Sequence, residues 1–141
     1  MANALKTLER IKKFELDEQR RILVAKLDNL EKLQNKLKDL CEEYEREKAF
    51  VAANPTLCDF GIYTEQYLKK RRRLEKNIAA AEEEIAQIRD VMADIFKEQK
   101  TYAIIDDIHQ KAHQHELDMA EQKLLDEVGT NAYIKHHKTD N

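Results

Sequence analysis

The chain has 141 residues, of which 38% are charged and 6% are aromatic, and it has no tryptophan. Its formal net charge of −3 creates no strong field that would draw nucleic acid or a membrane surface to the whole molecule. The abundance of Ala, Glu, Lys, Leu and Arg is typical of long helices and coiled coils and argues against a compact enzyme fold.

The first predicted element is a helix over about residues 2–52. Apolar side chains recur there every seven residues, at Leu16, Leu23, Leu30, Leu37, Tyr44 and Val51. Further leucines flank this line, and most other positions carry charged or amide side chains. One face of the helix therefore forms an apolar seam of heptad period, and the opposite face is solvated.

A turn is predicted over residues 53–61. The chain has one proline and two glycines, and Pro55 and Gly61 both lie in this stretch. Proline lacks an amide hydrogen and disfavours helical angles in the residue before it, whereas glycine accepts the angles of a sharp turn. We therefore expect the chain to reverse direction here. The other glycine, Gly129, is expected to end the second helix as a C-cap.

The second predicted helix covers about residues 62–128, and a flexible tail is expected over 129–141. Apolar residues alternate at spacings of four and three along its first half, at Tyr67, Leu74, Ile78, Ala81, Ile85, Ile88, Met92, Ile95 and Tyr102. Two polar residues, Arg71 and Gln99, interrupt this pattern, and polar groups at such positions often fix the register of a helix pair.

Two long helices joined by a short turn predict an all-α fold with an antiparallel coiled-coil hairpin, in which the second helix is longer than the first. We expect the whole chain to form a single hairpin domain. If the turn is centred near residue 57, residue i faces a residue near 114 − i, so Leu23 faces Met92. The basic run 69–73 then faces the acidic run 41–45, and we expect cross-helix ion pairs there instead of a nucleic-acid site.

This pairing leaves residues beyond about 112 without a partner in their own chain. The unpaired segment, called here the C-terminal extension, nevertheless carries the apolar residues Leu117, Ala120, Leu124, Leu125 and Val128. An isolated helix of this length is marginal in water, and an apolar stripe favours burial. The extension is therefore a frayed end, a helix folded back on the hairpin, or a segment that docks into another protein.

No residue pattern in the chain indicates catalysis or a cofactor. His109 and His113 have the i, i+4 spacing of helical zinc ligands, but the HExxH order is missing and no cysteine lies nearby. The chain lacks phosphate-binding loop motifs, and two helices in contact rarely form a closed pocket. We expect no catalytic residue, no cofactor and no metal.

Other features of the chain bear on its compartment and on the turn. Cys41 and Cys58 lack metal-ligand spacing and a secretory context, so we expect reduced thiols. No signal peptide is recognisable, and the apolar runs are too short to span a bilayer. The turn-end tyrosines Tyr44, Tyr63 and Tyr67 are either seam residues or a binding patch.

Four segments carry a resemblance to a known family: LKTLERIKKFELDEQRR, LCEEYEREKAF, GIYTEQYLKKRRRLEKNI and EQKLLDEVGTNAY. They resemble the FliJ family of flagellar type III export proteins, which are small hairpin coiled coils. The last segment is similar to the Gln-Lys-x-x-Asp-Glu pattern of the family, here Gln122, Lys123, Asp126 and Glu127. The chain departs from the family in its heavy basic run and at Lys48, where the family often has a second aromatic residue.

The resemblance implies a non-enzymatic cytoplasmic role at the base of the flagellar export apparatus, on the inner face of the inner membrane and without membrane insertion. The end that carries both termini is implied to enter the export ATPase ring, as the stalk of a rotary ATPase does. We assign that contact to the C-terminal extension. The turn end is implied to contact the cytoplasmic domain of the membrane export gate. We assign that contact to Leu40, Tyr44, Tyr67 and Leu74.

The resemblance also implies the handling of export chaperones and a part in flagellum biogenesis, motility and chemotaxis. Neither nucleic acid nor a lipid bilayer is expected as a partner. Two alternatives remain open from the sequence: a stalk of an injectisome, and a generic coiled-coil scaffold or holdase chaperone.

Overall fold

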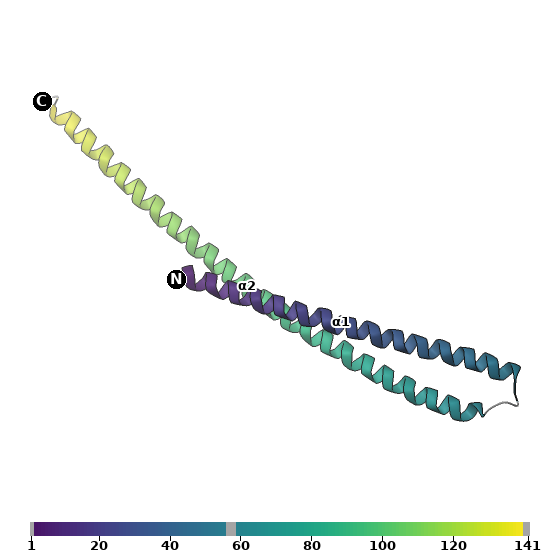
Figure 1. Cartoon of the computed structure of the whole chain (residues 1–141). Helices are drawn as coiled ribbons and strands as arrows, with labels where there is room; N and C mark the ends of the chain where they lie inside the picture. Colours follow the sequence, from purple (N-terminus) through teal and green to yellow (C-terminus); the bar gives the residue numbers. More distant parts are fainter. Residues whose placement is uncertain (1, 56–58, 140–141) are drawn as a thin grey trace. The chain divides into compact units, whose positions relative to one another are not determined.

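The computed structural model describes residues 2–55 and 59–139, and over these residues it contains two helices and no strand. Helix α1 spans Ala2–Ala53, and helix α2 spans Phe60–Thr139 (Figure 1). The predicted fold class is confirmed: the chain is all-α, its two helices pack against each other, and the second is longer. Part of the predicted turn, including Cys58, lies outside the described residues.

Asn54 caps the C-terminus of α1. Its backbone N–H donates to the carbonyl oxygens of Phe50 and Val51, both at 3.1 Å, and its side-chain amide donates to Phe50 as well. These bonds satisfy carbonyl groups that the last turn of a helix leaves without a partner. Pro55 follows at once and cannot continue the helix, so the sequence stops α1 at the expected place.

Helix α2 begins with a side-chain cap. The Oδ1 atom of Asp59 accepts a hydrogen bond of 3.0 Å from the backbone N–H of Gly61, as an N-cap aspartate does. A Cβ atom on Gly61 would lie 3.2 Å from that same oxygen. Gly61 has no positive φ, so its use here is to leave room for the capping carboxylate, and it does not bend the chain.

The expected end of α2 at residue 128 is wrong, because the helix continues through Gly129 to Thr139. Gly129 has no positive φ, and a Cβ atom there would meet nothing within 4 Å. A glycine inside a helix costs only about 1 kcal/mol relative to alanine, which the good helix formers on either side can offset. The last turn carries His136, His137 and Lys138, and basic groups there interact favourably with the helix dipole.

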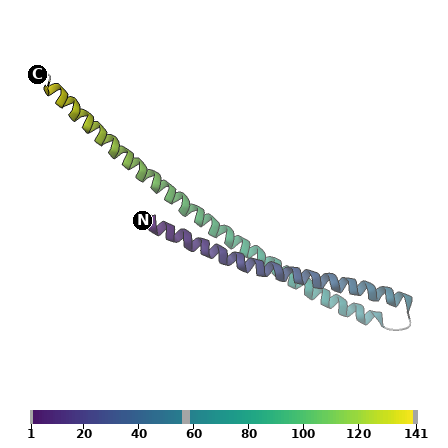
Figure 2. The same cartoon turned by 45° about the horizontal axis from the view of Figure 1, so that its top comes forward.

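The chain divides into two compact units. The first combines Met1–Lys13 with Lys97–Asn141, and the second is Phe14–Phe96. In the second unit α1 and α2 run side by side in opposite directions, as Figures 1 and 2 show from two angles. The expectation of a single domain stays a prediction.

The core of the hairpin unit is a thin seam between its two helices. Five side chains are buried: Leu16, Tyr67, Ala81, Ile85 and Ile95. All of them belong to the apolar lines that the sequence predicts. No described polar or charged side chain is buried. Because two helices cover only one face of each other, the seam stays narrow, and stability depends on few residues.

The register differs from the symmetric pairing rule by about one helical turn. Lys26, which that rule places opposite residue 88, forms a 2.8 Å ion pair with Glu84. In the other unit, Lys12 pairs with Glu98 instead of a residue near 102. Neither pair includes Leu23 or Met92, so their expected facing stays a prediction. The rule assumes that both helices end at the same level, whereas α1 continues about one turn past the level of the first residues of α2.

In the other unit, the first residues of α1 pack against α2 around Gln99. This half-buried side chain lines a hollow with Lys6, Arg10 and neighbouring residues of α1. From Asp107 to Lys138, every described residue of α2 is exposed. The C-terminal extension is thus helical and unpaired over its described length.

Candidate protein-binding sites

The turn end of the hairpin holds a stack of aromatic rings. Tyr44 from α1 lies against Tyr67 from α2, with ring centroids 3.9 Å apart and an interplanar angle of 8°. The rings of Phe60 and Tyr63 continue the stack, with centroids 5.5 Å and 6.1 Å from that of Tyr44. Phe60, Tyr63 and Tyr67 follow the i, i+3, i+7 spacing of one helix face, so α2 presents all three to Tyr44.

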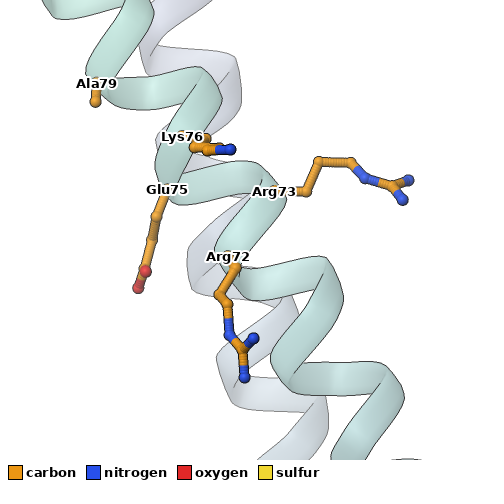
Figure 3. Close-up of a pocket in the computed structure, with 5 residues that line it drawn as sticks. All are labelled: Arg72, Arg73, Glu75, Lys76 and Ala79. Atoms are coloured by element: carbon orange, nitrogen blue, oxygen red, sulfur yellow. The ribbon is translucent and has the colours of Figure 1, made fainter.

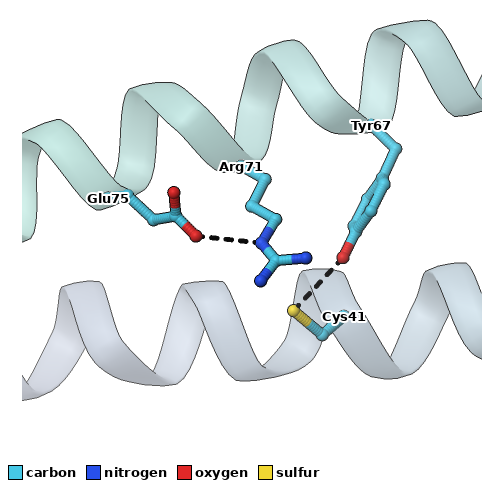
Figure 4. Close-up of polar contacts among 4 residues, drawn as sticks. All are labelled: Cys41, Tyr67, Arg71 and Glu75. Atoms are coloured by element: carbon cyan, nitrogen blue, oxygen red, sulfur yellow. Dashed lines mark hydrogen bonds and ion pairs between the residues drawn. The ribbon is translucent and has the colours of Figure 1, made fainter.

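Hydrogen bonds between side chains fix the orientation of two rings in this stack. The hydroxyl of Tyr67 donates to Sγ of Cys41 at 3.4 Å (Figure 4), and the hydroxyls of Tyr44 and Thr64 lie 3.3 Å apart. The bond to Cys41, together with burial, raises the pKa of Tyr67 above the usual value of 10.0. Only 7% of Tyr67 is exposed. Tyr67 is therefore a seam residue, and little of its surface can meet another protein.

Leu40 and Leu74 are more accessible than Tyr67. Both are half-buried, and both line one hollow of about 320 Å³ at the surface between the helices. Lys36, Asp39, Glu43, Lys70 and Arg73 form the charged rim of this hollow. The structure thus brings the four residues of the expected gate contact to the turn end, as two pairs: a packed tyrosine pair and an accessible leucine pair.

Phe60 belongs to the same cluster but was missed as a site residue in the sequence. Its signal was its i, i+7 spacing from Tyr67 directly after the turn. Phe60 lies between Pro55 and Gly61, so the sequence assigned it to the turn. In the structure α2 begins at Phe60 itself, one residue before Gly61.

The expected ion pairs between the basic run and the acidic run are wrong. The salt bridges of the run stay within α2: Lys69 with Glu65 at 3.8 Å, and Arg71 with Glu75 at 2.9 Å (Figure 4). Among the residues that the structure describes, no ion pair joins the run to Glu42, Glu43 or Glu45. The register explains this, because a shift of one turn moves the acidic run toward the turn end and away from its expected partners.

Five apolar residues of the C-terminal extension lie on one side of the helix. At 100° per residue, Leu117, Leu124 and Val128 lie within about 40° of one another around the helix axis. Ala120 and Leu125 flank them on either side. All five are exposed, Leu124 to 60%. An apolar stripe of this kind without a partner is typical of a surface that binds another protein.

The histidines of the extension form no metal site in the described part of the chain. His109 and His113 are exposed, and no group of three or more His, Cys, Asp or Glu side chains that could hold a metal ion is found among the described residues. The absence of a metal requirement stays a prediction. Neither helix, over its described length, has a stretch long and apolar enough to cross a membrane.

Two long helices that pack against each other, the longer of which carries an exposed apolar stripe, define a coiled-coil hairpin protein. The family model described as Flagellar FliJ protein matches residues 1–138, and the chain belongs to this family. It is therefore a flagellar export-related protein, from a family that is a non-catalytic component of export. No curated protein and no solved structure matches the chain.

Proposed function

We propose that this protein is the central stalk that links the flagellar export ATPase ring to the membrane export gate. In this role it catalyses no reaction itself. It works in the cytoplasm, at the inner face of the inner membrane, and it also receives export chaperones. The observation that supports the proposal is the C-terminal extension, in which every described residue from Asp107 to Lys138 is exposed although one side is apolar.

The apolar stripe of the C-terminal extension can supply a useful share of the free energy of binding to the export ATPase ring. Burial of a leucine side chain contributes roughly 1.5–3 kcal/mol, and about half of each leucine in the stripe is still exposed. Leu117, Leu124 and Leu125 together would then contribute roughly 2.5–5 kcal/mol, against about 8 kcal/mol for a micromolar complex. Such a contact holds a helix in a ring while allowing it to turn or dissociate.

The turn end is proposed to contact the cytoplasmic domain of the export gate. The accessible pair Leu40 and Leu74 offers an apolar floor for this contact, and the charged rim around it can orient a partner. The packed tyrosines Tyr44 and Tyr67 support this surface from inside the hairpin, because they hold the ends of the two helices together.

The alternatives differ from this proposal in their partners. An injectisome stalk would bind the ATPase of another secretion system, and membership of a flagellar family favours the flagellar one. A holdase would bind unfolded clients and would need no ATPase.

The test is stimulation of the purified export ATPase of the same organism by the full chain. Leu124→Asp with Leu125→Asp is expected to abolish stimulation, because it places two charges in the stripe. The matched control, His115→Asp with Thr130→Asp, adds the same two charges on the opposite side of the helix and should stimulate like the unmodified chain.

Circular dichroism must show the same helix content for both double variants, so that a loss of stimulation reports a lost contact and not a lost helix. Stimulation that survives Leu124→Asp with Leu125→Asp would mean that the extension is a frayed end, and the stalk proposal would fail.

A further inference from the structure

The outer side of α2 in the hairpin unit carries charges in an ordered line. Lys69, Lys76, Glu83 and Asp90 recur every seven residues, and all four are exposed. At 100° per residue this line lies roughly 160° around the helix axis from the buried Ile85, so it faces away from α1. In chain order the line reads basic, basic, acidic, acidic.

These four charged side chains make few and long polar contacts within their own chain. Lys76 and Asp90 make no hydrogen bond or ion pair among the described residues. Lys69 approaches Glu65 only at 3.8 Å, and Glu83 accepts a hydrogen bond of 3.4 Å from Gln87. An ordered row of charges on a solvated face is therefore available to a partner.

A line that changes sign at its midpoint is complementary to itself. We propose that this face of α2 binds a second copy of the chain in antiparallel orientation, with a two-fold axis between Ala79 and Ala80. Lys76 then faces Glu83 of the second copy, and Lys69 faces Asp90 of the second copy. Two-fold symmetry repeats each contact, so one interface holds four attractive pairs.

The side chains beside the charged line suit a close approach of two helices. Ala79 and Ala80 are exposed and present only methyl groups at the two-fold axis. Arg72 and Arg73 lie to either side of Lys76, and in Figure 3 their side chains extend from α2 with α1 behind it. Because alanine buries little apolar surface, the charges decide both the affinity and the register. The complex must therefore weaken as salt rises.

The same pattern disfavours an extended polyanion as the partner. Residues 69–76 contain six basic residues and one acidic residue, whereas 77–84 contain three glutamates and no basic residue. A nucleic acid or an anionic membrane lying along α2 would thus meet repulsion roughly 12 Å from the centre of the basic stretch. A second copy meets less repulsion, because the line pairs opposite charges and the like-charged pair of Glu65 with Asp94 of the second copy lies far from the two-fold axis. This inference does not rest on the stalk proposal.

The test is equilibrium sedimentation of the full chain at roughly 50 mM and about 1 M salt, which change the Debye length from above 10 Å to about 3 Å. We expect a concentration-dependent dimer at low salt and a monomer at high salt. Lys76→Glu alone and Glu83→Lys alone should each raise the dissociation constant on the order of tenfold, because each reverses two of the four pairs. Lys38→Glu makes the same charge change on α1 and should have no effect.

Charge exchange makes the test specific to this register. The K76E/E83K double variant should recover the homodimer, and an equimolar mixture of the two single variants should form a heterodimer. A chain that stays monomeric at low salt would overturn the proposal, as would single variants that are not rescued by exchange. A monomer that binds a labelled DNA duplex, and loses that binding in Lys76→Glu, would identify a polyanion site instead.

Discussion

Replacement of Tyr67 by alanine should be among the most destabilising single substitutions in the hairpin unit. Truncation of a buried aromatic residue costs roughly 3–5 kcal/mol. Tyr67 is 7% exposed, and its ring lies 3.9 Å from that of Tyr44. The seam is open to water on both sides, so part of the cavity would refill. We therefore expect the free energy of unfolding to fall by about 3 kcal/mol, the lower end of that range.

Two matched variants separate the causes of this loss. Tyr67→Phe keeps the ring and removes the hydroxyl, with its hydrogen bond to Cys41 and its interaction with the exposed Arg71, so it should cost about 1 kcal/mol. Leu68→Ala truncates the next residue, which is 39% exposed, and should cost about 1 kcal/mol or less. Urea titration followed by circular dichroism measures all three. If Tyr67→Ala costs no more than Leu68→Ala, the aromatic stack does not hold the turn end together.

Three further predictions concern the same unit. In a background without the native cysteines, a short bismaleimide should join Lys26→Cys to Glu84→Cys within one chain. Preferential cross-linking to a cysteine one turn further along α2 would instead support the symmetric register. Because the pKa of Tyr67 is raised, its contribution to stability is complete below pH 10 and is lost above it; the melting temperature should fall above pH 10, and by less in Tyr67→Phe. Leu40→Ala with Leu74→Ala should weaken gate binding while ATPase stimulation is retained, and loss of both would mean that the turn end had unfolded.

Heptad spacing predicted most of the fold because, among the described residues, the buried side chains all lie on the heptad-spaced apolar lines. Leu16, Ile85 and Ile95 are buried where the period places them. The ends of the helices were less predictable, since a helix end depends on local capping. Asp59 caps the N-terminus of α2 through a hydrogen bond that composition does not reveal. Gly129 does not end α2, because the backbone there stays helical.

The register could not be obtained from the seam alone. Apolar residues recur every three or four positions, so a shift of one turn again places apolar residues against each other. The symmetric rule therefore looked satisfactory, although the ion pair of Lys26 with Glu84 contradicts it. The four residues of the expected gate contact do share the turn end, because that placement depends on which residues lie near the turn and not on their individual partners; the contact itself stays a prediction. For Tyr67, burial rather than position decides whether it can bind.

Site-specific photo-cross-linking in living cells tests the stalk account most directly. A photoreactive amino acid at Leu124 should cross-link to the export ATPase, and one at Leu40 should cross-link to the cytoplasmic domain of the export gate. The same probe at Lys38, on the outside of α1, gives the background. Cross-links from Leu124 to the gate, or to a broad mixture of clients without the ATPase, would contradict the account.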